Sequence, residues 1–187
     1  MQAVSDEQLV QWITAGDASC LGTLFERHHQ ALFNFMVQMT QNPSLAEDLV
    51  QESFMRVLKA AHTFRGDASF RSWLFNIARN HFYDCLRKDK RLQPLEDMDP
   101  PSTAANDSDP ATQFEEIEKK VQFQAAMSRL PKKQREIIWL GRFELDSFEQ
   151  LGEALGCSSG TARVRMHRAV KQLKQQLSVV LEEVTHA

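Results

Sequence analysis

The chain has 187 residues, of which 42% are hydrophobic and 25% are charged, and its formal net charge is −3. This composition is typical of a soluble protein with one sizeable core or two small ones. No run of about 18 apolar residues occurs, and residues 1–10 are acidic and polar, which excludes a membrane span and a signal peptide. We therefore expect a cytoplasmic protein that is not inserted in a membrane.

The charge is unevenly distributed along the chain. Residues 1–91 contain ten basic and ten acidic side chains, residues 92–118 contain eight acidic and no basic ones, and residues 119–187 contain twelve basic and seven acidic ones. This pattern predicts a mixed domain, an acidic connection and a basic domain, the last of which suits a nucleic-acid partner.

Helices and no sheet are expected in the first part, because apolar residues recur at helical spacing and Gly and Pro are scarce. Ser5 with Gln8 forms a capping box that begins the first helix. Asn42 followed by Pro43 predicts the cap and first turn of a third helix, after a long second one. A fourth helix is predicted over residues 68–88.

A linker is predicted at residues 92–113. This segment contains four of the six prolines together with Ser, Asp and Asn, and it has too little apolar surface to offset the entropy of ordering. The chain is thus divided into a domain at 1–91, a flexible acidic linker at 92–113 and a domain at 114–187. The fold class is all-α, with two small helical domains.

The second domain ends in a predicted helix-turn-helix. Helices are expected near 115–128, 132–142, 147–155 and 159–181. Gly156 suits a left-handed turn between the last two, and Gly152 is small enough to let them cross closely.

The last helix carries a basic outer face with small residues at its start. Such a helix can enter the major groove, because short side chains let the backbone approach phosphate and long donors reach base edges. The alternative is a solvated basic face of a helical bundle. The candidate DNA-binding residues are Ser159, Gly160, Thr161, Arg163, Val164, Arg165, His167, Arg168 and Lys171.

Nothing in the sequence indicates catalysis, a metal or a cofactor. It has no HExxH motif, glycine-rich phosphate loop or nucleophile elbow, and His28 and His29 have no suitably spaced partner. The three cysteines, Cys20, Cys85 and Cys157, are far apart and lack the spacing of a zinc site or a disulfide framework, so we expect buried free thiols.

Three blocks together resemble the extracytoplasmic-function (ECF) sigma factors of bacterial RNA polymerase. They are AEDLVQESFMRVL at 46–58, FRGDASFRSWLFNIARNHFYDCLRK at 64–88 and LPKKQREIIWL at 130–140, and they occur in the family's order around a linker. The resemblance implies a four-helix sigma domain 2, a tether and a helix-turn-helix sigma domain 4. It also implies binding to core RNA polymerase and promoter DNA, promotion of DNA opening, and control by an anti-sigma factor.

The resemblance gives roles to two helices of the first domain. It implies that an outward stripe on the third helix, Asp48, Gln51, Glu52 and Met55, binds the clamp helices of the largest polymerase subunit, whereas the alternative is a solvated acidic face. On the fourth helix Trp73, Leu74 and Ile77 are expected in the core. The residues assigned to the minus-ten element are Phe64, Arg65, Gly66, Asp67, Ser69, Asn76, Arg79, Asn80, Tyr83 and Arg87, and the last helix is assigned to the minus-thirty-five element.

Two alternatives remain open at this stage. The acidic linker either mimics nucleic acid inside the polymerase or only keeps the chain soluble. A helix-turn-helix regulator that acts without core polymerase would explain the last helix equally well, but it leaves the acidic stripe and the aromatic fourth helix unexplained.

Overall fold

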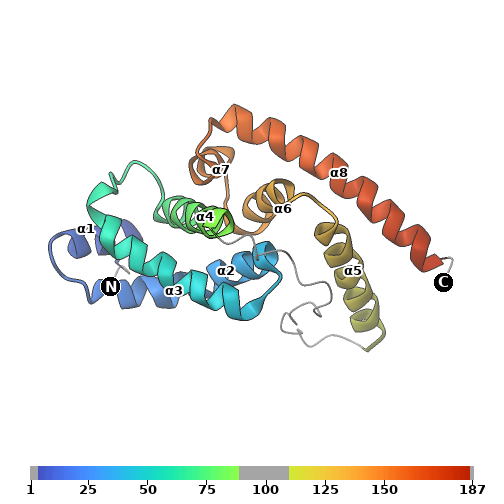
Figure 1. Cartoon of the computed structure of the whole chain (residues 1–187), viewed down its shortest axis with the longest axis horizontal. Coiled ribbons are helices and arrows are strands. Elements are labelled where there is room, and N and C mark those ends of the chain that lie inside the picture. Colours follow the sequence, from blue (N-terminus) through green and yellow to red (C-terminus); the bar gives the residue numbers. More distant parts are fainter. Residues whose placement is uncertain (1–3, 89–109, 186–187) are drawn as a thin grey trace.

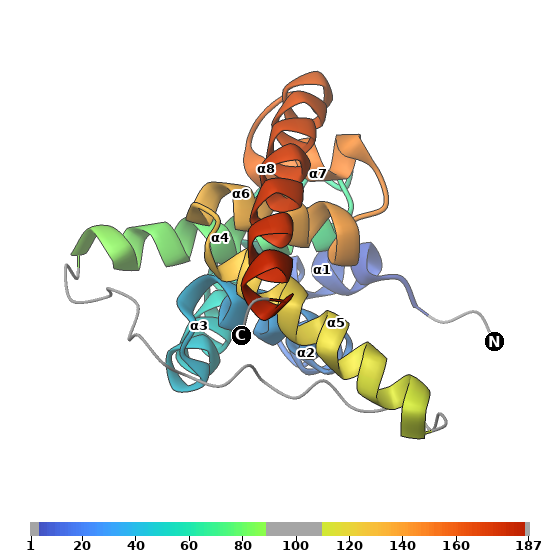
Figure 2. The same ribbon diagram turned by 90° about the vertical axis from the view of Figure 1, so that its right-hand side faces the viewer.

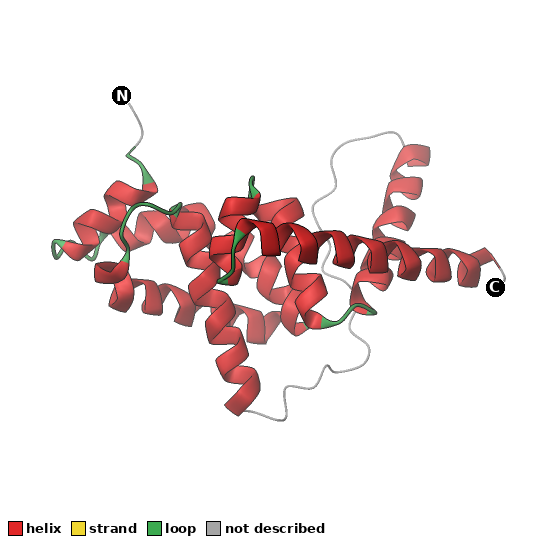
Figure 3. Ribbon diagram, turned by 90° about the horizontal axis from the view of Figure 1, so that it is seen from above, coloured by secondary structure: helices red, strands yellow, loops and turns green. Residues whose placement is uncertain are grey.

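The computed structural model describes residues 4–88 and 110–185, with the backbone alone at 110–117 and 184–185. These ranges contain helices and no strand, as Figure 3 shows. In chain order they are α1 (Asp6–Thr14), α2 (Cys20–Thr40), α3 (Pro43–Ala60), the 3-10 turn η1 (Ala61–Thr63), α4 (Phe70–Lys88), α5 (Pro110–Ser128), α6 (Lys132–Trp139), the π-helical segment η2 (Leu140–Glu144), α7 (Phe148–Leu155) and α8 (Ser159–Thr185) (Figure 1).

The predicted helix starts are confirmed by their caps. The Ser5 hydroxyl accepts a hydrogen bond from the Gln8 amide at 3.2 Å, and the Gln8 side chain accepts one from the Ser5 amide at 3.1 Å. At α3 the Asn42 side-chain oxygen accepts a hydrogen bond from the Leu45 amide at 3.1 Å, and Pro43 is the first helical residue. These contacts satisfy amides at the helix N-terminus that have no partner within the helix.

The core of the first domain lies between α2, α3 and α4. The inner face of α3 is buried as its spacing predicts, at Ala46, Leu49, Val50, Ser53, Phe54 and Val57. Phe35 of α2 meets Phe75 of α4 edge-on at 5.4 Å between ring centroids. This packing fixes which faces of α3 and α4 remain available to partners.

The helix-turn-helix depends on two glycines. Gly156 adopts φ +64, the left-handed conformation predicted for the turn after α7. At Gly152 a Cβ atom would lie 2.6 Å from the Cys157 carbonyl oxygen and 3.1 Å from backbone atoms of Ser158 and Ser159. The predicted close crossing of α7 and α8 therefore requires the absence of a side chain at Gly152.

Two helix boundaries differ from the prediction. The helix expected to run from Lys132 to Arg142 ends at Trp139 and continues as a widened π-helical turn, in which the Leu145 amide bonds the Leu140 carbonyl at 2.8 Å. Helix α5 begins at Pro110, inside the segment assigned to the linker. Residues 92–109 of that linker lie outside the described residues. The two alternatives given for the acidic linker therefore stay predictions for these residues.

The two domains pack against each other, which the sequence analysis did not predict. We expected separate domains, each with its own core. Instead α4 lies against α7 and α2 against α6 (Figures 1 and 2). Buried apolar side chains from both domains form one continuous cluster. Several polar contacts join the domains at this junction, and they determine which site residues are accessible.

Candidate polymerase and nucleic-acid interfaces

The acidic stripe of α3 is accessible. Asp48, Gln51 and Met55 are exposed, and Glu52, with a side chain 46% exposed, pairs loosely with Arg56 at 3.6 Å. Asp48 lies three and four residues before Gln51 and Glu52, and Met55 lies four and three residues after them, which is the spacing of a single helix face. Met55 is itself 46% exposed, and a flexible apolar side chain among charged ones suits contact with a partner protein.

The loop before α4 is only partly available for DNA. Arg65, Gly66 and Asp67 are exposed, and Gly66 adopts φ +77. Phe64, by contrast, is half-buried, with its ring 5.1 Å from that of Trp73. In this conformation the Phe64 ring therefore packs within the domain. The Ser69 hydroxyl is hydrogen-bonded to the Ser72 hydroxyl at 2.7 Å.

Only part of the polar stripe of α4 is exposed. This stripe consists of Ser72, Asn76, Arg79, Asn80, Tyr83 and Arg87. Asn80 and Arg87 are exposed as predicted. Ser72, which its sequence position also places on this stripe, is instead fully buried. Of the residues expected in the core, Leu74 is buried, and Trp73 and Ile77 are half-buried and packed against the buried apolar cluster. The remaining three stripe residues, Asn76, Arg79 and Tyr83, contact the second domain.

Glu136 of α6 is the centre of these contacts. Its carboxylate, only 2% exposed, lies 2.6 Å from Arg79 Nε, and it accepts a hydrogen bond from the Tyr83 hydroxyl at 3.2 Å. The Arg79 guanidinium also lies 5.2 Å from the centre of the Tyr83 ring. Burial raises the pKa of Glu136 despite the opposing effect of Arg79, and burial likewise raises the pKa of Tyr83.

Further polar contacts join the domains, among them a hydrogen bond from the Gln38 amide of α2 to the Gln124 side-chain oxygen of α5 at 3.1 Å. The Asn76 amide donates to the Glu153 and Ala154 carbonyls, both at 3.1 Å, at the C-terminal end of α7. Arg71 pairs with Glu144, which is 6% exposed, at 2.5 Å, and burial raises the pKa of this carboxyl. Buried Arg135 donates to the Gln38 carbonyl of α2 at 2.9 Å.

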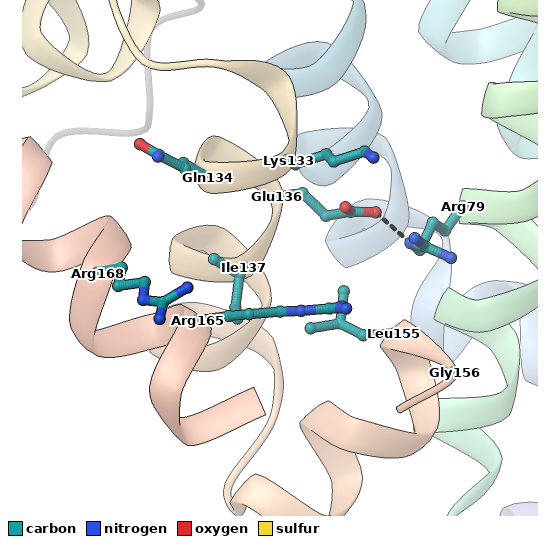
Figure 4. Close-up of a pocket in the computed structure, with 9 residues that line it drawn as sticks. All are labelled: Arg79, Lys133, Gln134, Glu136, Ile137, Leu155, Gly156, Arg165 and Arg168. Atoms are coloured by element: carbon teal, nitrogen blue, oxygen red, sulfur yellow. Dashed lines mark ion pairs between the residues drawn. The ribbon is translucent and has the colours of Figure 1, made fainter. Parts of the chain in front are cut away.

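A cavity of about 440 Å³ lies beside the Arg79–Glu136 pair (Figure 4). We call it the interdomain cavity. Arg79 of α4 and Arg165 of α8 reach it from opposite sides (Figure 4). Its lining is Arg79, Lys133, Gln134, Glu136, Ile137, Leu155, Gly156, Arg165 and Arg168. The lining thus contains four cationic side chains and one carboxylate.

The outer face of α8 remains open. Arg163, Val164, Arg165, His167, Arg168 and Lys171 are all exposed, and so are Gly160 and Thr161, while Ser159 is half-buried. The Arg163 guanidinium lies 5.0 Å from the centre of the Phe148 ring of α7, which holds it at the start of the helix. The structure therefore brings the predicted minus-thirty-five residues together on one accessible surface.

Sequence reasoning missed the partners that connect the domains, and it was wrong about the burial of two cysteines. The only available signal for Glu136 was a single carboxyl at an inward position of a basic helix, between Arg135 and Ile137. His28 Nε2 lies 2.6 Å from Asp6 of α1, a contact between helices that the sequence did not predict. Of the free cysteines only Cys20 is buried, and the other two are half-buried.

Comparisons with known proteins show the family of this chain. The Sigma-70 region 2 model matches residues 24–92, and the Sigma-70 region 4 model matches residues 120–173. RNA polymerase sigma factor CarQ of Myxococcus xanthus is 33% identical over 165 residues, which cover 86% of this chain and 91% of that protein. ECF RNA polymerase sigma factor SigX of Bacillus subtilis is 30% identical, with 86% and 85% covered. The chain belongs to the ECF sigma factors.

Two solved structures share the fold. The sigma factor RpoE of Bartonella quintana, in complex with the anti-sigma factor NepR, matches with a TM-score of 0.67 at 27% identity, over 84% of this chain and 96% of that one. CnrH, in complex with the cytosolic domain of CnrY, has the same TM-score of 0.67 at 24% identity, over 93% and 97%. This ECF sigma factor is a transcription initiation factor that binds core RNA polymerase, and not an enzyme. No helix in the described part of the chain is long and apolar enough to cross a membrane.

Proposed function

We propose that this ECF sigma factor divides its work among three surfaces. The α3 stripe binds core polymerase, the loop 64–69 with α4 holds and opens the minus-ten element, and α8 reads the minus-thirty-five element. The observation that carries this division is the open arrangement of the basic residues on α8 together with the separate acidic stripe on α3. One surface suits phosphate and base edges, and the other suits cationic groups of a protein.

Each surface has the chemistry that its role requires. The small residues at the start of α8 let its backbone approach phosphate, and its arginines supply donors to bases and flanking phosphates. If four or five phosphates are neutralised, log affinity for duplex should fall with log salt at a slope of roughly −4. On α4, Asn80 and Arg87 offer polar and cationic contacts to a separated strand, whose unpairing costs a few kcal/mol.

An anti-sigma factor is the proposed regulator. Support comes from the relative RpoE of Bartonella quintana, which was solved with the anti-sigma factor NepR. The exposed stripe of α3 is the kind of surface such a partner would cover in competition with polymerase. Because core polymerase is a cytoplasmic enzyme, we place the activity of this chain in the cytoplasm.

Footprinting with and without core polymerase distinguishes this function from that of an independent helix-turn-helix regulator. DNA fragments selected by the chain with core enzyme are tested against the chain alone at the same concentration. The proposal expects promoter-specific protection only when core enzyme is present. Equal, sequence-specific protection by the chain alone would favour the regulator.

A further inference from the structure

Helix α1 contacts the end of the loop that is assigned to the minus-ten element. The Glu7 carboxylate of α1 accepts a hydrogen bond from the Phe70 amide at 3.2 Å, and Phe70 is the first residue of α4, directly after the loop 64–69. The two residues are 63 positions apart in the sequence, so the bond is a tertiary contact and not a local cap. No residue of α1 belongs to the three surfaces proposed above.

The Phe70 amide has no acceptor within its own helix. The first amides of a helix lack such partners, and the helix dipole favours a negative charge beside them. The loop serves two of the following amides, because Ser69 Oγ accepts from the Ser72 amide and the Ser69 carbonyl accepts from the Trp73 amide, both at 3.1 Å. The acceptor for the Phe70 amide is supplied instead by Glu7.

A second contact from α1 leads to the side chain of the same residue. Asp6, next to Glu7, lies 2.6 Å from His28 Nε2 of α2, and it also pairs with Arg27 at 2.7 Å. The His28 ring packs against the Phe70 ring at 5.2 Å between ring centroids, and Phe70 is only 1% exposed. Adjacent carboxylates of α1 therefore hold the backbone of Phe70 directly and its ring through His28.

The other end of the loop belongs to the same group of rings. The Phe64 ring lies 6.5 Å from the Phe70 ring and 5.1 Å from the Trp73 ring, and α1 also lies against η1, which directly precedes Phe64. Both ends of the loop are thus fixed, while residues 65–67 between them are exposed. Supporting contacts of this kind keep binding residues in one geometry.

We infer that Glu7 is a positioning residue for the minus-ten strand, whose carboxylate keeps the loop 64–69 in the conformation that holds unpaired bases. This inference rests on the proposed role of the loop. Without the acceptor the start of α4 is held less firmly and the loop populates other conformations. The apparent affinity for the separated strand then falls with the fraction of chains in the competent conformation. Loss of one capping hydrogen bond corresponds to roughly a five- to tenfold decrease.

Glu7→Ala and Glu7→Gln are compared in the full chain bound to core polymerase. Alanine removes the acceptor, whereas glutamine keeps a side-chain oxygen that can accept from the Phe70 amide. Asn42→Ala is the matched control. It removes a bond of the same kind, from the Leu45 amide to the Asn42 side chain at 3.1 Å, at the end of α3 that is remote from the loop.

Two measurements are made on a promoter fragment selected by the wild-type holoenzyme. Permanganate reactivity of unpaired thymines reports opening, and nuclease footprinting of the minus-thirty-five side reports duplex binding. Glu7→Ala should lower thymine reactivity roughly five- to tenfold and leave the footprint and co-purification with core polymerase unchanged. Glu7→Gln should recover most of the wild-type reactivity, and Asn42→Ala should retain it.

Wild-type thymine reactivity in Glu7→Ala, or an equal loss in Glu7→Ala and Glu7→Gln, would overturn the positioning role. An equal loss in Asn42→Ala, or a footprint that weakens in proportion, would also overturn it, since Glu7 would then only stabilise the domain. Failure of the proposed function has a different signature. In that case Arg65→Ala/Asp67→Ala, which changes the exposed loop itself, would open the promoter as well as the wild type does.

Discussion

Gly152→Ala tests the geometry that positions α8. The new Cβ would meet only backbone, with the Cys157 carbonyl oxygen at 2.6 Å and atoms of Ser158 and Ser159 at 3.1 Å. Backbone cannot rotate away as a flexible side chain can, so the turn and the start of α8 must shift. Such overpacking costs about 1–3 kcal/mol, and we expect the upper half of that range.

The assay is thermal unfolding of the full chain. For a protein of this size 1 kcal/mol changes Tm by roughly 2–4 °C, so Gly152→Ala should lower Tm by about 4–12 °C. Gly160→Ala is the matched control at the other side of the turn, where a Cβ meets nothing within 4 Å. Alanine there lies in a helix and should leave Tm unchanged or raise it by an amount equivalent to at most about 1 kcal/mol.

Equal Tm values for the two glycine variants would refute this reasoning. They would mean that α7 and α8 do not cross as closely as the structure has them. At temperatures where Gly152→Ala is still folded, its affinity for promoter duplex should also fall, because the reading helix is displaced.

Three other perturbations address the separate surfaces and their junction. Asp48→Arg with Glu52→Arg should abolish co-purification with core polymerase while leaving duplex binding unchanged. Retained association would mean that the α3 stripe is not part of the polymerase interface. Arg168→Ala should reduce the salt slope of duplex binding by about 1 and spare core association, whereas Lys174→Ala, on the flank of α8, should leave the slope unchanged. Glu136 has a raised pKa, so the folded chain binds its proton more readily than the unfolded chain, where the ordinary value is 4.5. The stability that this group contributes is thus present at low pH and lost as pH rises through the raised pKa. Because Glu136→Gln removes this titration, the Tm of the variant should fall less than that of the wild type between pH 5 and 7. A Tm that falls more steeply with rising pH in Glu136→Gln than in the wild type would contradict the assigned burial.

Local features of the fold could be read from the sequence because their signals are local. Ser5, Asn42 and Ser147 each cap a helix within three residues of themselves, and the buried face of α3 follows from helical spacing alone. The turn at Gly156 was predictable for the same reason, since only its own φ angle is involved.

The packing of one domain on the other could not be read in this way. Arg79 and Glu136 are 57 positions apart in the sequence, and a polar residue on a helix looks the same whether it faces water, DNA or another domain. Helix α4 illustrates the ambiguity, because Asn80 and Asn76 lie one turn apart, yet one is exposed and the other is bonded to α7. The burial of Ser72 could not be read from the sequence for a related reason: its hydroxyl is hydrogen-bonded to that of Ser69, which allows a polar residue to be buried.

Sequencing the 5′ ends of transcripts made in vitro from genomic DNA tests the central claim most directly. Core polymerase is supplied with the wild-type chain, with no addition, or with the Asp48→Arg/Glu52→Arg variant. The account predicts a defined set of new start sites, preceded by shared minus-ten and minus-thirty-five sequences, only in the reaction that contains core polymerase and the wild-type chain. The same start sites in all three reactions would contradict it.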